Sequence, residues 1–194
     1  MKKYIHLSLI ILLFACSSKN TAQKNSVDQT AMASTSGSGM QSEAKVEKEK
    51  EKDVIKWLSY DEAVKQSKKK PKKIFIDVYT DWCGWCKKMD KTTFEDAQIA
   101  TYVNKKYYAV KLNAESTKTL TFQGKEMTER ELSSKVFKIT GYPCTVYLDS
   151  DEKLIQPIPG YMDVPTLDKI LHYIGDDHYK TKTWEQFQLS YTGE

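Results

Sequence analysis

Hydrophobic and polar residues follow regular patterns over the last three quarters of the chain. Residues 73–79 form a nearly continuous apolar run with polar residues on both sides, which is typical of a strand buried on both faces. Over residues 164–174 the apolar side chains, from Leu167 to Ile174, instead recur at the spacing of one helix face. The chain therefore combines buried strands with amphipathic helices.

These two kinds of pattern alternate. Ser59 and Asp96 are placed to cap helices, and Glu62 completes a capping-box pattern with Ser59. Such alternation predicts an α/β fold, with a central mixed sheet of about four to five strands flanked by helices. In chain order the expected elements are a helix over 59–69, a strand over 73–79, a helix entered at 83–89, a helix after Asp96 with Ile99, Ala100 and Val103 inward, a strand over 107–112, a polar loop or irregular insert over 113–125, a helix over 127–138, strands over 144–148 and 154–158, a helix over 164–174, and a short C-terminal helix that docks through Trp184, Phe187 and Leu189.

The composition narrows the class of protein. The 194 residues include 30 basic and 26 acidic side chains, which gives a formal net charge of +4. A nucleic-acid-binding protein usually carries a stronger basic bias, so we expect no nucleic-acid partner. The 12 Tyr, 6 Phe and 4 Trp residues are ample for a core and argue against intrinsic disorder. Four cysteines are too few for a dense disulfide scaffold.

The N-terminus has the features of a secretory signal peptide. Two lysines precede a short apolar run over residues 5–15, which is too short to span about 30 Å of hydrocarbon as a helix. Residues 13–16 (Leu-Phe-Ala-Cys) resemble the bacterial lipobox, in which the signal is cut before a cysteine that carries lipid. We expect a lipoprotein signal peptide over residues 1–15 and lipid attachment at Cys16; a plain signal peptide, cut nearby, is the alternative.

Residues 16–53 are expected to form a flexible tether. They are rich in Ser, Thr, Gln, Lys and Glu, and six lysines balance six acidic residues. Such a segment buries too little apolar surface to offset the entropy of ordering it, and as a coil it would reach about 30–37 Å. The Lys/Glu alternation over 43–53 could instead continue a helix into the folded part. We place that part at 54–194, as one domain with a C-terminal helical extension.

Cys83 and Cys86 enclose Gly-Trp directly after the strand over 73–79, at the start of a helix. Unpaired N–H groups and the dipole at a helix N-terminus favour a thiolate over a thiol. We expect Cys83, on the outer first turn, to be the nucleophile. Cys86 would be shielded and would resolve a mixed disulfide, since thiol–disulfide exchange passes through such an intermediate.

The cysteine pair is also compatible with two non-redox roles. A structural zinc site needs four ligands, and the remaining candidates, Cys144, His172 and His178, include no second close pair. An inert structural disulfide is the second of these roles. We expect redox chemistry and no metal.

The segment over 76–87, Ile-Asp-Val-Tyr-Thr-Asp-Trp-Cys-Gly-Trp-Cys-Lys, resembles the active-site segment of the thioredoxin family. The form Trp-Cys-Gly-Trp-Cys-Lys-Lys-Met over 82–89 is similar to its secreted bacterial branch, which is related to the reducing domains of membrane thiol–disulfide interchange proteins. The likeness covers about residues 55–175, with an insertion near 114–130, and it implies a thioredoxin-like fold.

Further residues match the family in the right order. The resemblance implies that Asp77, six residues before Cys83, is a buried acid and that Lys111 pairs with it. Residues 141–143 (Gly-Tyr-Pro) match a loop whose proline is cis and lies across from the cysteines, and Gly160 matches a glycine before the last helix.

The roles of these residues agree with elementary chemistry. Burial should raise the pKa of Asp77, because desolvation disfavours a carboxylate, and Asp77 could then accept the proton of Cys86 through a water. Pro143, if cis, leaves the neighbouring backbone free to pair with an extended substrate. The simpler alternatives are a satisfied core polar group for Asp77, an exposed strand lysine for Lys111 and an ordinary trans proline.

The remaining candidates are residues expected to lie close to the cysteines. For Trp82 and Trp85, the alternative to substrate contact is plain packing. Cys144 departs from the family, which usually has Thr after the proline; it is either a small buried core residue or an accessory redox thiol. The expected substrate contacts are Trp82, Gly84, Trp85, Tyr142 and Pro143.

Together these features predict an extracytoplasmic thiol–disulfide oxidoreductase, lipid-anchored to a bacterial membrane and facing the periplasm, with no cofactor beyond its redox-active disulfide. A cation between the cysteines would favour an oxidant, and Gly84 and Trp85 supply none, which favours a reductase. The resemblance implies a membrane thiol–disulfide transporter as electron donor and protein disulfides as acceptors. An oxidase or isomerase is the alternative with the same chemistry, and a non-catalytic thioredoxin-fold binding module is the alternative from another class.

Overall fold

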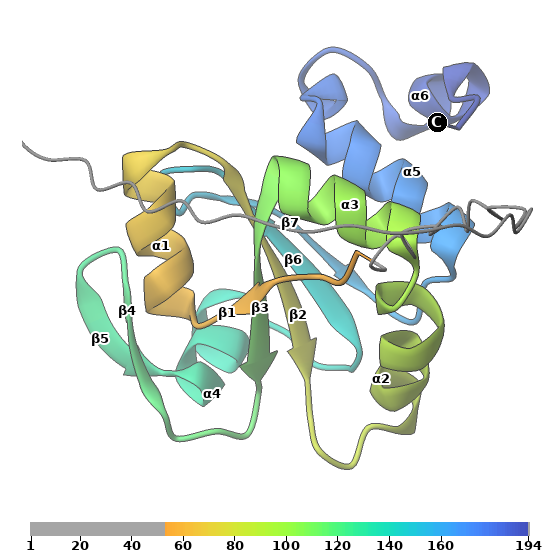
Figure 1. The fold of residues 1–194 in the computed structure, drawn as a ribbon. Helices are drawn as coiled ribbons and strands as arrows, with labels where there is room; N and C mark the ends of the chain where they lie inside the picture. Colours follow the sequence, from red (N-terminus) through yellow and green to blue (C-terminus); the bar gives the residue numbers. More distant parts are fainter. Residues whose placement is uncertain (1–52, 194) are drawn as a thin grey trace, which may run out of the picture. The chain divides into compact units, whose positions relative to one another are not determined.

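The computed structural model describes residues 53–193, so the predicted signal peptide, Cys16 and nearly all of the tether lie outside the described residues. Its main sheet has five strands in the order β1-β3-β2-β6-β7 (Figure 1). β1 and β2 run parallel to β3, whereas β6 is antiparallel to β2 and β7 is antiparallel to β6. The predicted α/β fold with a mixed sheet is confirmed. The elements are β1 (Trp57–Leu58), α1 (Tyr60–Lys69), β2 (Lys73–Tyr79), α2 (Gly84–Met89), a π-helical turn (Asp90–Phe94), α3 (Ala97–Lys106), β3 (Tyr107–Asn113), β4 (Thr119–Phe122), β5 (Lys125–Thr128), α4 (Glu129–Glu131), a second π-helical turn (Leu132–Val136), β6 (Cys144–Leu148), β7 (Leu154–Pro159), α5 (Val164–Gly175), a 3-10 turn (His178–Lys180) and α6 (Trp184–Ser190).

β2 lies at the centre of the sheet and divides the core into two parts. Ile74, Ile76 and Val78 pack with α1 on one face, while Phe75 packs with α3 and α5 on the other. Because successive strand residues point to opposite faces, Asp77 shares the α3 and α5 face with Phe75. Burial on both faces explains the nearly continuous apolar run of this strand.

The predicted helix starts are confirmed by their caps. Ser59 Oγ accepts the N–H of Glu62 at 3.3 Å, and Asp96 Oδ1 accepts the N–H groups of Gln98 and Ile99 at 2.9 and 3.1 Å. These contacts satisfy backbone donors that have no partner within the helix. The apolar positions expected inside α1 and α3 are buried, among them Ala63, Val64, Ile99, Ala100 and Val103.

The segment expected to be a polar loop over 113–125 is instead partly a β-hairpin. β4 and β5 pair antiparallel around a two-residue turn, Gln123 and Gly124, which both have positive φ angles of 48° and 78°. This left-handed backbone is what a tight hairpin requires. The sequence does not predict these strands, because only Leu120 and Phe122 of β4 face the core, and such a short alternation is a weak strand signal.

The helix expected over 127–138 is shorter and less regular than predicted. Met127 and Thr128 belong to β5, α4 covers only Glu129–Glu131, and a π-helical turn follows. Thr128 both ends the hairpin and caps α4, because its hydroxyl oxygen accepts the N–H of Glu131 while the Glu131 carboxylate accepts its backbone N–H. The last two residues of β5 are therefore the first two of the expected helix.

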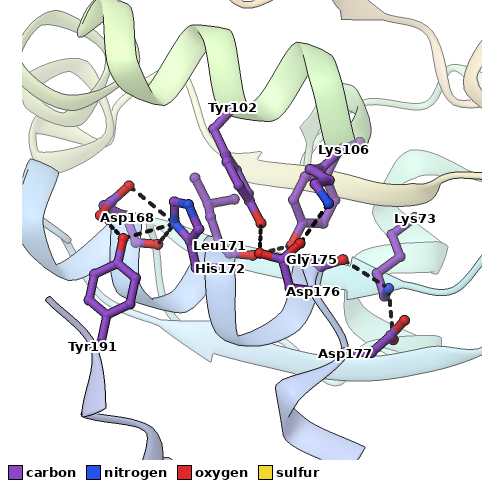
Figure 2. Close-up of polar contacts among 11 residues, drawn as sticks. Lys73, Tyr102, Lys106, Asp168, Leu171, His172, Gly175, Asp176, Asp177 and Tyr191 are labelled. Carbon is purple, nitrogen blue, oxygen red and sulfur yellow. Dashed lines mark hydrogen bonds and ion pairs between the residues drawn. The ribbon is translucent and has the colours of Figure 1, made fainter. Parts of the chain in front are cut away.

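The C-terminal extension folds back on α5. α6 packs Phe187 against the rings of Tyr173 and Trp184, as predicted, but Leu189 is 91% exposed and does not dock. Leu189 lies on the far side of α6 from Phe187, because two residues advance a helix by about 200°. Beyond α6, the Tyr191 hydroxyl donates to Asp168 on α5 (Figure 2).

Candidate active site

The cysteine pair lies at the start of α2, shortly after the end of β2. Cys83 is the N-cap residue of α2, and its Sγ accepts the backbone N–H of Cys86 at 3.0 Å. The backbone N–H of Cys83 donates to the Thr80 carbonyl at 3.2 Å, which closes the turn after the strand. Cys83 and Cys86 form a disulfide with their Cα atoms 5.3 Å apart, so the structure is that of the oxidised form.

Exposure does not distinguish the two cysteines. We expected an outer Cys83 and a shielded Cys86, yet each is only 3% exposed. In the oxidised form the two sulfur atoms are bonded to each other, and both residues are buried. What separates them is the helix start, since Cys83 alone holds the N-cap position, where a thiolate gains most from backbone N–H groups.

A buried ion pair joins the two central parallel strands. Asp77 on β2 is register partner to Lys111 on β3, and Lys111 Nζ donates to Asp77 Oδ2 at 2.8 Å. Asp77 is 1% exposed. Its other oxygen, Oδ1, is buried and has no hydrogen-bond partner among residues 53–193.

Burial and the ion pair shift the pKa of Asp77 in opposite directions. Desolvation raises the pKa of Asp77, the charge and hydrogen bond of Lys111 lower it, and the net value is about 6. For Lys111, burial alone would lower the pKa, but the attraction of Asp77 and Asp90 outweighs it and the pKa is raised. Asp77 is thus a carboxyl group that can hold or release a proton near neutral pH.

Asp90 is a site residue that sequence reasoning missed. It begins the π-helical turn after α2 and accepts a short hydrogen bond from Lys111 Nζ. Lys111 therefore joins two carboxylates, one buried and one half-buried. The spacing of four residues between Asp90 and Cys86, one turn along the helix, was the only signal in the sequence.

The ammonium group of Lys111 is surrounded by rings. Its Nζ lies 4.9 Å from the ring centre of Trp57, 5.4 Å from that of Tyr79 and 5.1 Å from that of Phe94. Cation–π contacts of this kind stabilise a partly desolvated cation. Lys111 is therefore a partly buried cation, not the exposed strand lysine of the simpler alternative.

The loop before β6 adjoins the cysteine motif. The Tyr142–Pro143 peptide bond is cis, as the resemblance implied. Gly160, at a φ of 100°, donates its N–H to the Pro143 carbonyl at 2.8 Å. The ring of Tyr142 meets that of Trp82 edge-on at 6.0 Å, so this loop and the residue before Cys83 are in contact.

Both tryptophans of the motif are exposed. Trp82 is 67% exposed and donates its indole N–H to Glu115 Oε1 at 3.0 Å. Trp85 is 57% exposed and packs on Tyr161 with ring centres 5.4 Å apart. Glu115 and Tyr161 were not predicted as site residues, because they approach the motif only through the tertiary fold. Gly84, between the cysteines, is exposed, and a Cβ there would meet no atom within 4 Å.

Cys144 is buried at the first position of β6 and is a free thiol. Burial raises its pKa to about 11, with a smaller contribution from the charge of Asp77 and an opposing one from the backbone of Ile158. It lies in the core cluster that contains Val78, its register partner on β2. These facts fit a small core residue.

A zinc site at the cysteine pair gains no support. Over residues 53–193 there is no group of three or more His, Cys, Asp and Glu side chains that could hold a metal ion. His172, one of the candidates, lies on α5 with its ring beside Asp168 and Tyr191 (Figure 2). The cysteine pair is engaged in its own disulfide.

The model of the thioredoxin-like domain matches residues 60–175 of this chain. The chain belongs to the thioredoxin-like family. The match runs from α1 to α5, includes every strand of the main sheet except β1, and stops before α6, so the C-terminal extension lies beyond the matched range. The hairpin of β4 and β5 lies within the matched range.

Two solved structures illustrate the thioredoxin-like fold. The DsbH oxidoreductase aligns with a TM-score of 0.51 at 20% identity, over 76% of this chain and 96% of that one. A Bacteroides thetaiotaomicron protein, provisionally named a disulphide-isomerase, aligns with a TM-score of 0.52 at 28% identity, over 68% of this chain and 98% of that one.

Curated relatives of this thioredoxin-like chain include the thiol:disulfide interchange protein DsbD. That of Photorhabdus laumondii is 25% identical over 125 residues, which are 63% of this chain and 20% of the relative. That of Ralstonia nicotianae is 31% identical over 90 residues, 46% of this chain and 13% of the relative. The chain thus aligns with a fifth or less of these proteins. No helix between residues 53 and 193 is both long and apolar enough to cross a bilayer.

Proposed function

We propose that this chain is a thiol–disulfide oxidoreductase that acts outside the cytoplasm, tethered to a membrane, and that it works as a reductase. The observation that carries this proposal is the Cys83–Cys86 disulfide at the start of α2, at the end of the strand that bears the buried Asp77. The family membership supports the same chemistry. No cofactor is needed, because the cysteine pair itself carries the two electrons.

In the first step the Cys83 thiolate of the reduced form attacks one sulfur of a client disulfide. A bond forms between Cys83 Sγ and that sulfur, the client S–S bond breaks, and the other client sulfur leaves as a thiolate. The backbone N–H of Cys86, 3.0 Å from Cys83 Sγ, is placed to offset negative charge on that sulfur.

In the second step Cys86 loses its proton and attacks Cys83 Sγ. The Cys83–Cys86 bond forms, the mixed disulfide breaks, and the second client sulfur leaves as a thiolate; the two client thiolates take protons from water to give the dithiol. Asp77 accepts the proton of Cys86 through a water in this scheme. Its pKa of about 6 and its unpartnered Oδ1 support that role, since a proton acceptor works best when its pKa lies near the working pH.

The residues between the cysteines favour one direction of electron flow. Gly84 and Trp85 add no cation that would stabilise the reduced form and make the pair a strong oxidant. We therefore assign a reductase, fed by a membrane thiol–disulfide transporter and acting on protein disulfides. The similarity to the thiol:disulfide interchange protein DsbD supports an electron donor of that type.

The N-terminal sequence supports a compartment outside the cytoplasm and a lipid anchor. We propose cleavage after residue 15, lipid attachment at Cys16 and a tether over 16–53 that carries the domain of 54–194 away from the membrane. Trp82, Gly84, Trp85, Tyr142 and Pro143 would meet the client.

An isomerase is the second candidate, because the Bacteroides thetaiotaomicron structure, at 28% identity, carries that provisional name. An isomerase would restore activity to a scrambled disulfide protein without a net change in electrons. A reductase would consume the dithiol form once for each client disulfide.

The redox potential of the Cys83–Cys86 pair, combined with insulin reduction, tests the assignment. A potential near about −270 mV supports a reductase, and one near about −120 mV an oxidase. Cys83→Ser should abolish insulin reduction, whereas Cys86→Ser should accumulate mixed disulfides with clients. Full activity of Cys83→Ser would overturn the choice of nucleophile, and reactivation of scrambled ribonuclease without net reduction would favour the isomerase.

A further inference from the structure

Beside the redox pair lies a cluster of two aromatic rings and one ammonium group. Trp85 on α2 packs on Tyr161, and Lys88 Nζ lies 4.7 Å from the ring centre of Trp85 and 5.1 Å from that of Tyr161. We call these three residues the Trp85 patch. Tyr161 comes from the segment between β7 and α5, so the fold brings the patch together from two distant parts of the chain.

Trp85 and Lys88 are exposed and Tyr161 is half-buried, which sets the patch apart from core packing. Trp85 is 57% exposed. Among the described residues, the large hydrophobic side chains that stay exposed are Val54, Trp82, Trp85, Leu154 and Leu189. Two of these five adjoin Cys83 and Cys86. Exposed aromatic surface that gathers at a reactive group is typical of a place where a partner binds.

The rings are also held in position. The hydroxyl groups of Tyr161 and Thr92 lie 3.0 Å apart, and Thr92 Oγ1 donates to the Lys88 carbonyl at 2.9 Å. Tyr161 further packs on the core cluster of α3 and α5. A contact surface that is ordered before binding loses less entropy when the partner arrives.

α2 and the turn that follows it carry exposed positive charge. Lys87, Lys88 and Lys91 are exposed on α2 and the turn that follows it. The nearby Asp90 is paired with Lys111, so it does little to neutralise them. A carboxylate is the group that this arrangement would attract.

We propose that Trp85, Tyr161 and Lys88 form a client subsite, which takes an apolar side chain next to the reacting client cysteine together with a carboxylate close to it. Tyr161 and Lys88 are then specificity-determining residues of the reaction. The inference rests on the proposed function, because it names the kind of protein disulfide that the site prefers.

The test uses the pre-reduced protein and single-turnover rate constants, so that no electron donor is required. Two synthetic peptide disulfides carry Leu beside the reacting cysteine and differ only in two neighbouring residues, Glu in one and Lys in the other. Bis(2-hydroxyethyl) disulfide, which is small and neutral, is the reference substrate. The Glu peptide should react about three-fold faster than the Lys peptide at low salt, in line with an exposed ion pair, and 0.5 M salt should reduce the preference.

Lys88→Gln should remove most of this preference and leave the rate with the neutral disulfide within two-fold. Lys87→Gln removes the same charge from the same exposed helix and should keep the preference. Tyr161→Leu should slow both peptides but not the neutral disulfide. Equal rates for the two peptides, or equal losses in Lys88→Gln and Lys87→Gln, would overturn the subsite alone. Failure of the wild type to react with the neutral disulfide would overturn the proposed function and the subsite with it.

Discussion

Asp77 and Lys111 occupy the same register on the parallel strands β2 and β3, and their side chains meet with Oδ2 and Nζ 2.8 Å apart. Asp77 lies on the strand that leads into the redox disulfide. Because the carboxylate is buried, its ion pair only partly offsets the cost of desolvation, and the pKa of Asp77 stays raised at about 6. The ion pair with Lys111 thus lets Asp77 carry a charge in the core, and Asp77 can still take up a proton near pH 6.

Asp77 should make the oxidised protein less stable as the pH rises from 4 to 6. The folded state keeps a proton on Asp77 up to a pKa of about 6, while the unfolded chain releases it near its ordinary value of 3.8. The folded state therefore binds more protons in this window, and the free energy of unfolding should fall with rising pH, by about 2 kcal/mol between pH 4 and 6. Urea unfolding of the wild type and of Asp77→Asn at several pH values measures the slope.

Asp77→Asn should remove that slope, because the amide does not titrate. Cys83 and Cys86 are bonded to each other in this experiment and do not contribute. A slope of the same size in Asp77→Asn would assign it to other groups and contradict the raised pKa.

Asp90→Asn should lower the pKa of Asp77. The negative charge of Asp90 is among the influences that raise this pKa, after the larger effect of burial, and Asp90 shares Lys111 with it. Without Asp90, Lys111 would pair with Asp77 alone. An NMR titration of the Asp77 carboxyl carbon gives the pKa directly, and Glu95→Gln, which removes an exposed charge close by in the chain, is the control. A rise in the pKa would mean that Asp90 holds Lys111 in place and that the ion pair weakens without it.

Cys144 should be unreactive in the folded protein. Its thiol is buried and its pKa is raised to about 11, so almost no thiolate is present at pH 8. Iodoacetamide should label it only after unfolding in guanidinium chloride, and Cys144→Ala should reduce insulin at a rate within two-fold of the wild type. Fast labelling of the folded protein, or a large loss of activity in Cys144→Ala, would instead support an accessory redox thiol.

The packing of the C-terminal extension should contribute to the stability of the protein mainly through Phe187. This side chain is 3% exposed, and Phe187→Ala should lower the stability by about 3 kcal/mol, as large-to-small changes in a packed core do. Leu189→Ala, on the exposed side of the same helix, should change it by less than about 0.5 kcal/mol. Chemical unfolding of both variants makes the comparison, and similar losses would show that α6 does not dock as described. The rings around Phe187 are those of Tyr173, His178, Trp184 and Tyr191.

Local patterns in the sequence were enough to place four of the five strands of the main sheet and the cysteine pair, whereas the two-residue β1 was not predicted. The run over 73–79 indicated a strand buried on both faces, and the cysteine pair, which begins four residues beyond it, was expected at the start of the next helix. Capping residues such as Ser59 and Asp96 located two helix starts, because a cap is satisfied by groups within one turn. Features of this kind depend on neighbours in the chain and can be read without knowing the fold.

Tertiary structure decided what depends on contacts between distant segments. Asp90 joins Lys111, Glu115 bonds to Trp82 and Tyr161 packs on Trp85 only because strand register and helix packing bring them together. The hairpin over 119–128 was missed because its alternation is short and its turn lacks the usual Asn-Gly. Burial likewise belongs to the whole fold, which is why the equal exposure of Cys83 and Cys86 could not be foreseen from the position of each in its helix.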